Sequence, residues 1–141
     1  MNSPYHQGQR ITEGHVFRRI PNWRTHFDED EGRPDITAFA PRLQDGDALS
    51  AHLETLVSEV QAIRFMDEDP GLRNFGLCRL DIGQIVKETD GLAWVEYRGT
   101  AQPVLGHAHV VIRDCRAVEI QLVLARIARV VRPPRDLKDR A

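Results

Sequence analysis

Two histidines, His107 and His109, have the spacing best suited to shared chemistry in this chain. They fall in residues 106–112, a run of β-favouring side chains that begins with glycine. Side chains alternate along a strand, so both imidazoles are expected on one face. A zinc site would need a third protein ligand. The possible ones are Asp81, Glu96 and His15. Because nothing in the sequence fixes such a ligand, we expect two histidines on a solvated or hydrogen-bonded sheet face and no metal.

Arginines early in the chain form the second group that could do chemistry. Arg18 and Arg19 are neighbours in a strand candidate at residues 15–20, so one of them accompanies apolar side chains whichever face turns inward. An arginine near a core needs a carboxylate or several carbonyl partners. Planar guanidinium groups also suit phosphate and carboxylate recognition, and Arg33 in the next loop shares this property. Two roles therefore stay open for Arg18, an internal ion pair or the binding of an anionic ligand.

The sequence lacks the motifs that are typical of several classes of function. There is no phosphate-binding loop, no dinucleotide-binding glycine motif and no nucleophile elbow. Cys78 and Cys115 lie far apart, so no zinc or redox pair is indicated. The net charge of −2 argues against nucleic acid as the main partner. No signal-like or membrane-length apolar run is present, which predicts a cytoplasmic protein with reduced thiols and no membrane partner.

Hydrophobic periodicity places the elements that would position these side chains. The expected strands cover residues 15–20, 36–40, 76–82, 92–97, 106–112 and 130–131. Helices are expected at residues 54–65 and 117–129, with a short one at 82–88. In the first helix, Leu56 and Val60 are expected to pack on the sheet. Residues 48–53 fit either a strand or the start of that helix, for which Asp47 would be a suitable N-cap.

The expected fold class is α+β, with a single domain. It contains a mixed or antiparallel sheet of four to six strands, with the two main helices on one face. The domain is expected to span residues 14–132, between a flexible N-terminus at 1–13 and a charged C-terminal tail at 133–141. Aromatic residues make up 6% of the chain, so its core must be mostly aliphatic.

A set of short motifs resembles a group of small, uncharacterised bacterial proteins, to which no activity is attached. The motifs are Phe17-Arg18-Arg19-Ile20-Pro21, Gly32-Arg33-Pro34 with Ala38-Phe39, Leu49-Ser50, and Gly106-His107-Ala108-His109-Val110. The chain also resembles ADP-ribosyltransferase-like toxins of the RES type. Those proteins place an arginine on the first strand, a small hydroxyl residue on a later strand and a glutamate after it. The resemblance implies that these roles fall to Arg18 or Arg19, to Ser50, and to Glu54 or Glu59.

These observations predict a small intracellular bacterial binding or effector-accessory domain. It would recognise a polar or anionic small molecule, or a protein partner, and would need no cofactor. The candidate ligand-binding residues are Arg18, Arg19, Arg33, Ser50, His107 and His109. The alternative is a toxin or effector enzyme of the ADP-ribosyltransferase kind, which would use NAD. Whether the protein is an enzyme, and its oligomeric state, are left open by the sequence.

Overall fold

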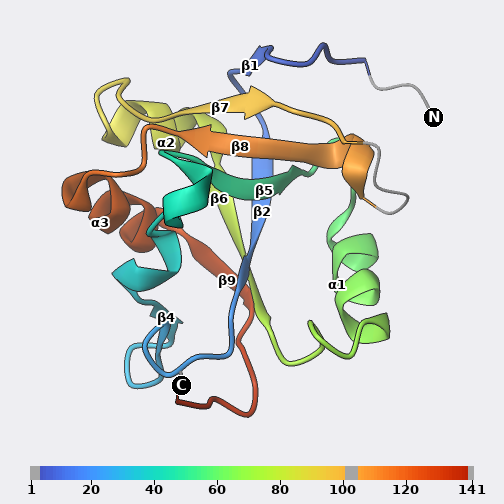
Figure 1. Cartoon of the computed structure of the whole chain (residues 1–141), viewed down its shortest axis with the longest axis vertical. Coiled ribbons are helices and arrows are strands. Elements are labelled where there is room, and N and C mark those ends of the chain that lie inside the picture. The colour runs from blue at the N-terminus through green and yellow to red at the C-terminus, as the bar shows by residue number, and fades with distance from the viewer. Residues whose placement is uncertain (1–3, 101–104, 140–141) are drawn as a thin grey trace.

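The fold is built on one antiparallel sheet with the strand order β1-β7-β8-β5-β2-β6-β9 (Figure 1). The computed structural model describes residues 4–100 and 105–139. The strands of this sheet are β1 (Arg10–Ile11), β2 (His15–Ile20), β5 (Leu49–Leu53), β6 (Gly76–Asp81), β7 (Trp94–Tyr97), β8 (His109–Arg113) and β9 (Arg129–Arg132). A separate hairpin pairs β3 (Phe27–Asp28) with β4 (Arg33–Pro34).

The helices connect these strands. They are α1 (Glu59–Glu68), α2 (Ile82–Glu88) and α3 (Val118–Ile127), with short 3₁₀ turns η1 (Ile36–Phe39), η2 (Leu43–Asp45) and η3 (Gly106–Ala108). Helix α1 begins at a capping box, in which the Ser58 hydroxyl accepts from the Gln61 amide and the Gln61 side chain accepts from the Ser58 amide. These reciprocal bonds satisfy amides that would otherwise lack partners and fix where the helix starts.

The sheet divides into two halves between β5 and β2. In Figure 1, β7, β8 and β5 run across the view, whereas β2, β6 and β9 run steeply down it. Strand β2 pairs with β6 over its whole length but with β5 only at Val16–Leu53 and Phe17–His52. Beyond Phe17 the two strands diverge, so the C-terminal half of β2 lies beside a split in the sheet.

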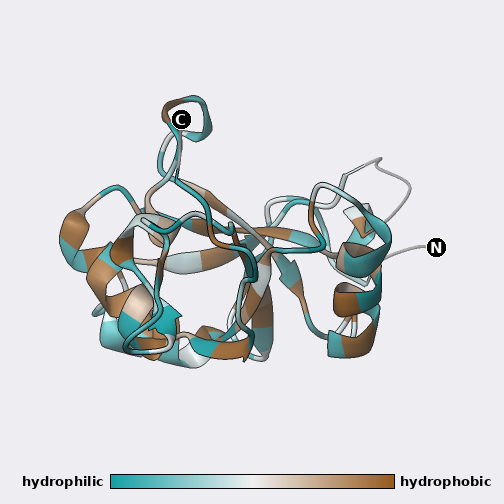
Figure 2. Cartoon of the chain, turned by 90° about the horizontal axis from the view of Figure 1, so that it is seen from below, coloured by the Kyte–Doolittle hydropathy of each residue, from teal (hydrophilic) through white to brown (hydrophobic). Residues whose placement is uncertain are grey.

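Both faces of the sheet are covered, by different helices. On one, here called the α3 face, side chains such as Val16 and Leu53 form the larger core with α2, α3 and η1. On the opposite face, the α1 face, Phe17 and Leu77 pack with Ala62 and Met66 of α1. Figure 2 places the two helical groups on separate sides of the molecule.

The α+β class and the single antiparallel sheet confirm the expectation from sequence, with a larger sheet of seven strands rather than four to six. The arrangement of the main helices differs from the expected one, because α1 and α3 pack on opposite faces. The reason lies in β2 and β6, where Phe17 and Leu77 present apolar side chains on the face that α3 leaves open. An apolar patch there requires a cover of its own.

The helix expected at residues 54–65 is wrong in its bounds. Of the two side chains expected to pack inward, Leu56 lies before the helix and packs, partly buried, against the core, whereas Val60 does not. Residues 49–53 form strand β5, because the alternation of Leu49, Ala51 and Leu53 supplies the core side of the sheet. The helix starts after Ser58, which replaces Asp47 as the N-cap. This later start turns Val60 outward, where it is 63% exposed.

Other elements also differ from expectation. In place of the strand expected at residues 36–40, Ile36–Phe39 forms a 3₁₀ turn, since the Asp35 side chain caps the Thr37 amide. Arg10–Ile11 pairs with β7 as strand β1, although the sequence placed it in a flexible N-terminus. In the expected tail, Lys138 bridges to Trp23 and its amide bonds the Asn22 carbonyl. The remaining expected strands and helices lie within a few residues of their observed bounds.

The two faces of α1 provide a direct test of this packing. We expect Met66→Ala to lower the free energy of unfolding by about 2–5 kcal/mol, because the 1% exposed side chain leaves a cavity. The matched change Val60→Ala on the exposed side should alter it by less than about 0.5 kcal/mol. Urea unfolding of both variants measures the difference. Equal losses would mean that α1 packs through another face.

Candidate functional site

The polar side chains of β5 and β8 gather on the part of the α1 face that the helix does not cover. We call the surface formed by Ser50, His52 and His109 the histidine face. Strands β5 and β8 pair so that His52 lies opposite His109, and the two ring centres are 6.3 Å apart. Ser50 precedes His52 by two residues, so its exposed hydroxyl lies on the same side of the sheet. Along β5, Leu49, Ala51 and Leu53 thus point into the core, whereas Ser50 and His52 point to the other face.

One ring nitrogen of His109 lies within hydrogen-bond distance of a described residue, and the other does not. Its Nε2 lies 3.3 Å from the Ser50 hydroxyl oxygen. Its Nδ1 is buried and has no hydrogen-bond partner among the residues that the structure describes. Burial lowers the pKa of His109, and the nearby Arg98 guanidinium lowers it further. The imidazole is therefore neutral at pH 7.

His52 is also kept neutral. Burial lowers the pKa of His52 from 6.5 to about 3, with further lowering by Arg19, His109 and His107. The charged groups that act on this ring are cationic, and none of the described carboxylates opposes them. The histidine face therefore combines two uncharged imidazoles with a positive surrounding.

Arg19 lies beside this face with its charge unpaired. It follows Phe17, the cross-strand partner of His52, on the same side of β2. Its guanidinium stacks over the Phe65 ring of α1 at 5.2 Å. No hydrogen bond or salt bridge joins the Arg19 side chain to any residue within the described ranges. Burial lowers the pKa of Arg19, and the more distant Asp69 carboxylate opposes this effect.

A network around Glu96 borders the other end of the histidine face. The buried Glu96 carboxylate accepts from Arg98 at 2.9 Å and from Arg113 at 3.1 Å, both through Oε2. Arg113 also donates to Asp47 at 3.2 Å. The backbone amide of Arg98 bonds the His109 carbonyl at 3.0 Å, which ties this arginine to the histidine strand. The network holds Arg98 through one of its nitrogens, and the Arg98 side chain as a whole is 44% exposed.

His107 belongs to the support of the site. It lies on η3 and not on β8, so the strand expected at residues 106–112 begins only at His109. Its Nε2 donates to the Leu56 carbonyl at 3.1 Å. Its own carbonyl accepts from the Tyr97 hydroxyl at 2.6 Å. Both bonds anchor η3 between β7 and the turn before α1.

Arg18 lies on the opposite face, within the split between β2 and β5. Its Nε and Nη2 donate to the Ala38 carbonyl at 3.1 and 2.9 Å, and its Nη1 donates to the Ser50 carbonyl at 2.8 Å. The guanidinium lies 5.8 Å from the centre of the Phe39 ring. Of the partners considered from sequence, several carbonyls rather than a carboxylate hold this arginine in the described structure. Burial lowers the pKa of Arg18, but an arginine remains charged at neutral pH.

Arg33 is also separated from the histidine face. It lines a pocket of about 460 Å³ between the β3–β4 hairpin and α3, together with Ile36, Leu122 and Arg126. Both carboxylates at this pocket are already engaged, Asp28 by backbone amides of its own loop and Asp35 as the cap of η1. The sequence-derived set of candidates therefore divides, with Arg19, Ser50 and His109 on one surface and Arg18 and Arg33 elsewhere.

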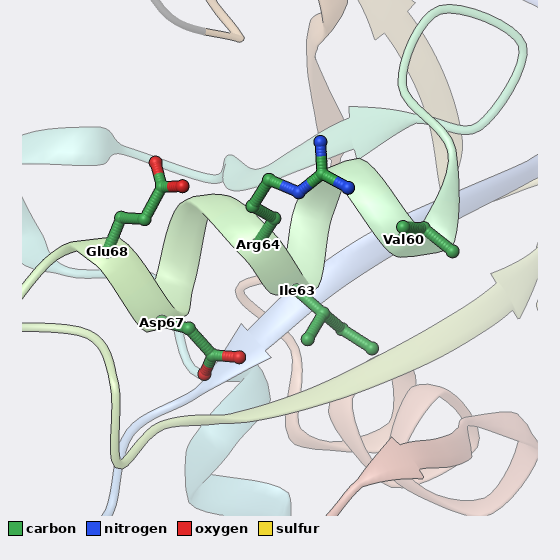
Figure 3. A pocket seen from close by; sticks show the side chains of 5 residues that line it. All are labelled: Val60, Ile63, Arg64, Asp67 and Glu68. Atoms are coloured by element: carbon green, nitrogen blue, oxygen red, sulfur yellow. The ribbon is translucent and has the colours of Figure 1, made fainter.

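A second hollow lies along α1. It has a volume of about 390 Å³ and is lined by Val60, Ile63, Arg64, Asp67 and Glu68. Figure 3 shows these side chains diverging from the helix, with Arg64 and Glu68 directed away from Ile63 and Asp67. Asp67 is already paired with Arg132 at 2.6 Å. Convergent polar groups are the mark of a ligand pocket, and this hollow lacks them.

Among the described residues, the cysteines and the usual metal-ligand side chains do not gather into a site. Cys78 and Cys115 are buried, and burial raises the pKa of each thiol to about 12, so neither is a nucleophile at neutral pH. Over residues 4–100 and 105–139, no group of three or more histidine, cysteine, aspartate or glutamate side chains is placed to hold a metal ion. Nor does this part of the chain include a helix with the length and apolarity needed to cross a membrane.

Comparisons with protein-family models, with curated proteins and with solved structures found no match to this chain.

Sequence reasoning missed His52 and Arg98 as members of the site. The signal for His52 was present, because Leu49, Ala51 and Leu53 alternate with Ser50 and His52 as in a half-buried strand. Residues 48–53 also fit the start of a helix, so this strand pattern did not single out His52. Arg98 carried no local signal, since its place beside His109 depends on the pairing of β7 with β8.

The two adjacent arginines should respond differently to removal. We expect Arg18→Ala to lower the free energy of unfolding by about 2–5 kcal/mol, because the Ala38 and Ser50 carbonyls lose their donors in the split. Arg19→Ala removes an unpaired cation and should change it by less than about 1 kcal/mol. Chemical denaturation without added ligand measures both. A large loss for Arg19→Ala alone would reverse the roles assigned to the pair.

The histidines also predict how stability depends on pH. Folded His52 stays neutral down to pH about 3, whereas an unfolded histidine titrates near 6.5. Its stabilising contribution is therefore complete above pH 6.5 and is lost as the pH falls from 6.5 toward 3. Between about pH 4 and 6, the free energy of unfolding of the wild-type protein should rise with pH, in part because only the unfolded state protonates this histidine. We expect His52→Gln to reduce that slope by about 1.4 kcal/mol per pH unit, the contribution of one proton. Ser50→Ala, a change without a titrating group on the same strand, should leave that slope unaltered.

Proposed function

We propose that this protein is a binding module for a small anionic ligand, held on the histidine face and beside Arg19. The ligand would carry a phosphate or carboxylate group. A partner protein that presents such a group could use the same contacts. The module would hold its ligand without a metal or cofactor.

The observation that carries this proposal is the unpaired charge of Arg19. The Arg19 side chain is half-buried, its guanidinium carbon lies over the Phe65 ring, and it meets no acceptor among the described residues. Removing a cation from water is costly unless an opposite charge compensates it. A bound anion would supply that charge, and the planar guanidinium fork suits phosphate and carboxylate oxygens.

The neighbouring groups complement an anion in a second way. Neutral imidazoles and a serine hydroxyl can donate N–H and O–H bonds without adding charge. Ser50 offers an exposed hydroxyl, which lies 3.3 Å from the Nε2 of His109. In addition to burial, Arg19 lowers the pKa of His52, and Arg98 lowers the pKa of His109. The same two cations would attract a negatively charged ligand.

An NAD-using transferase is the second candidate. Arg19 and Ser50, two of the residue types of that class, lie on the same face of neighbouring strands. That class also requires a glutamate after these residues, and the two glutamates in question are less suitably placed. Glu54 is held by Arg79 in a two-bonded pair at 2.8 and 2.9 Å and lies 3.6 Å from His15. Glu59 is exposed in the first turn of α1.

A thermal-shift panel tests the proposal. The probes are inorganic phosphate, acetate, NAD, a divalent metal salt and a short single-stranded DNA, each added to the full chain. A ligand that binds only the folded protein at a hundred times its Kd stabilises it by about 2.7 kcal/mol. We expect the small anions to raise the Tm of the wild-type protein, and Arg19→Gln to remove most of that increase.

The control is Arg126→Gln, which removes the same charge from α3 on the other side of the sheet. It should keep the full response to anions. Equal responses of Arg19→Gln and the wild-type protein would contradict an anion site at Arg19. A response to NAD but not to phosphate or acetate would favour the transferase.

A further inference from the structure

We propose that the ligand of the histidine face carries two anionic groups, one bound by Arg19 and the other by Arg98. This inference rests on the proposed function and names the class of ligand, a two-headed anion such as a polyphosphate or a dicarboxylate. Ser50, His52 and His109 would contact the part of the ligand between its two charged ends.

The first end of the site is Arg19. It lies on β2 at the split in the sheet, two residues after the strand partner of His52. Its contact with the Phe65 ring orients the guanidinium, but all of its N–H donors are without described acceptors. One anionic group can therefore be accommodated here without displacing an internal partner.

The second end is Arg98. Its amide bonds the His109 carbonyl, and its Nη1 bonds Glu96, so both its backbone and one side-chain nitrogen are fixed. Glu96 shares the same oxygen, Oε2, with Arg113. One carboxylate oxygen thus serves two guanidinium groups, and the Nε and Nη2 of Arg98 are left without an acceptor in the described part of the chain. This end of the site is already oriented before a ligand arrives.

The strand order separates the two ends of the site. Arg19 lies on β2 and Arg98 directly follows β7, and β5 and β8 lie between these strands, so the two backbones are about three strand spacings, roughly 14 Å, apart. A phosphate or carboxylate group can engage one arginine in this arrangement. A ligand with two such groups on a short linker can engage both, and the second contact then forms at a high effective concentration.

The experiment compares one-headed with two-headed anions by isothermal titration calorimetry. The probes are phosphate, pyrophosphate and tripolyphosphate in one series, and acetate with dicarboxylates from malonate to adipate in the other. The two series distinguish phosphate from carboxylate recognition. Within at least one series we expect a two-headed anion to bind about tenfold more tightly than the one-headed anion, as a second charge-assisted contact provides.

Variants separate this inference from the proposed function. Arg98→Gln should abolish the advantage of the two-headed anion, so that two-headed and one-headed anions bind this variant with affinities within about twofold of each other, and Arg98→Lys should restore part of that advantage. Arg126→Gln should bind every probe as the wild-type protein does. The Tm of each variant without ligand establishes that it is folded.

Three outcomes are decisive against the inference. Arg19-dependent binding of phosphate or acetate with no preference for two-headed anions would overturn it and leave the proposed function standing. A two-headed preference that survives in Arg98→Gln would do the same. Absence of binding of every anion in both series would overturn the inference and the proposed function together.

Discussion

The Arg18 guanidinium in the split between β2 and β5 is the interaction on which the rest of the structure depends. The two half-sheets share only a short pairing, so the backbone alone joins them weakly. Arg18 adds bonds from β2 to the Ser50 carbonyl on β5 and to the Ala38 carbonyl on η1. By donating to both carbonyls, the Arg18 guanidinium supplies partners for backbone acceptors that the diverging strands would otherwise leave unpaired.

The same split gives Arg19 its special position. Side chains alternate along β2, so the residue after the structural arginine points to the opposite face. There, α1 covers Phe17 and Leu77 but leaves Ser50 exposed. Arg19 lies between the covered and uncovered regions, in contact with Phe65 and without a counter-ion among the described residues. One arginine therefore maintains the fold while its neighbour remains available for binding.

The electrostatics of the histidine face depend on how its neighbours are restrained. Burial and adjacent cations keep His52 and His109 neutral, so each ring can form hydrogen bonds without repelling Arg19 as a second full charge. Glu96 holds Arg98 and Arg113 in place and is itself buried. Arg98 and Arg113 are thus held without a ligand, and such restraint would lower the ordering cost of anion binding at the proposed site.

The sequence by itself determined the α+β class, strand β2, helix α2 and the main part of α3, because these depend on local periodicity and on breakers such as Pro21 and Gly91. It also selected Arg19, Ser50 and His109 as candidates from their side-chain chemistry. Only the tertiary structure decided that Arg18 turns inward and Arg19 outward, that α1 and α3 take opposite faces, and that His52 and Arg98 join the site. Those outcomes depend on which strands pair and where they diverge, and the partners are distant in sequence. Local propensity carries no information about such contacts, since their free energy exists only once both segments are packed together.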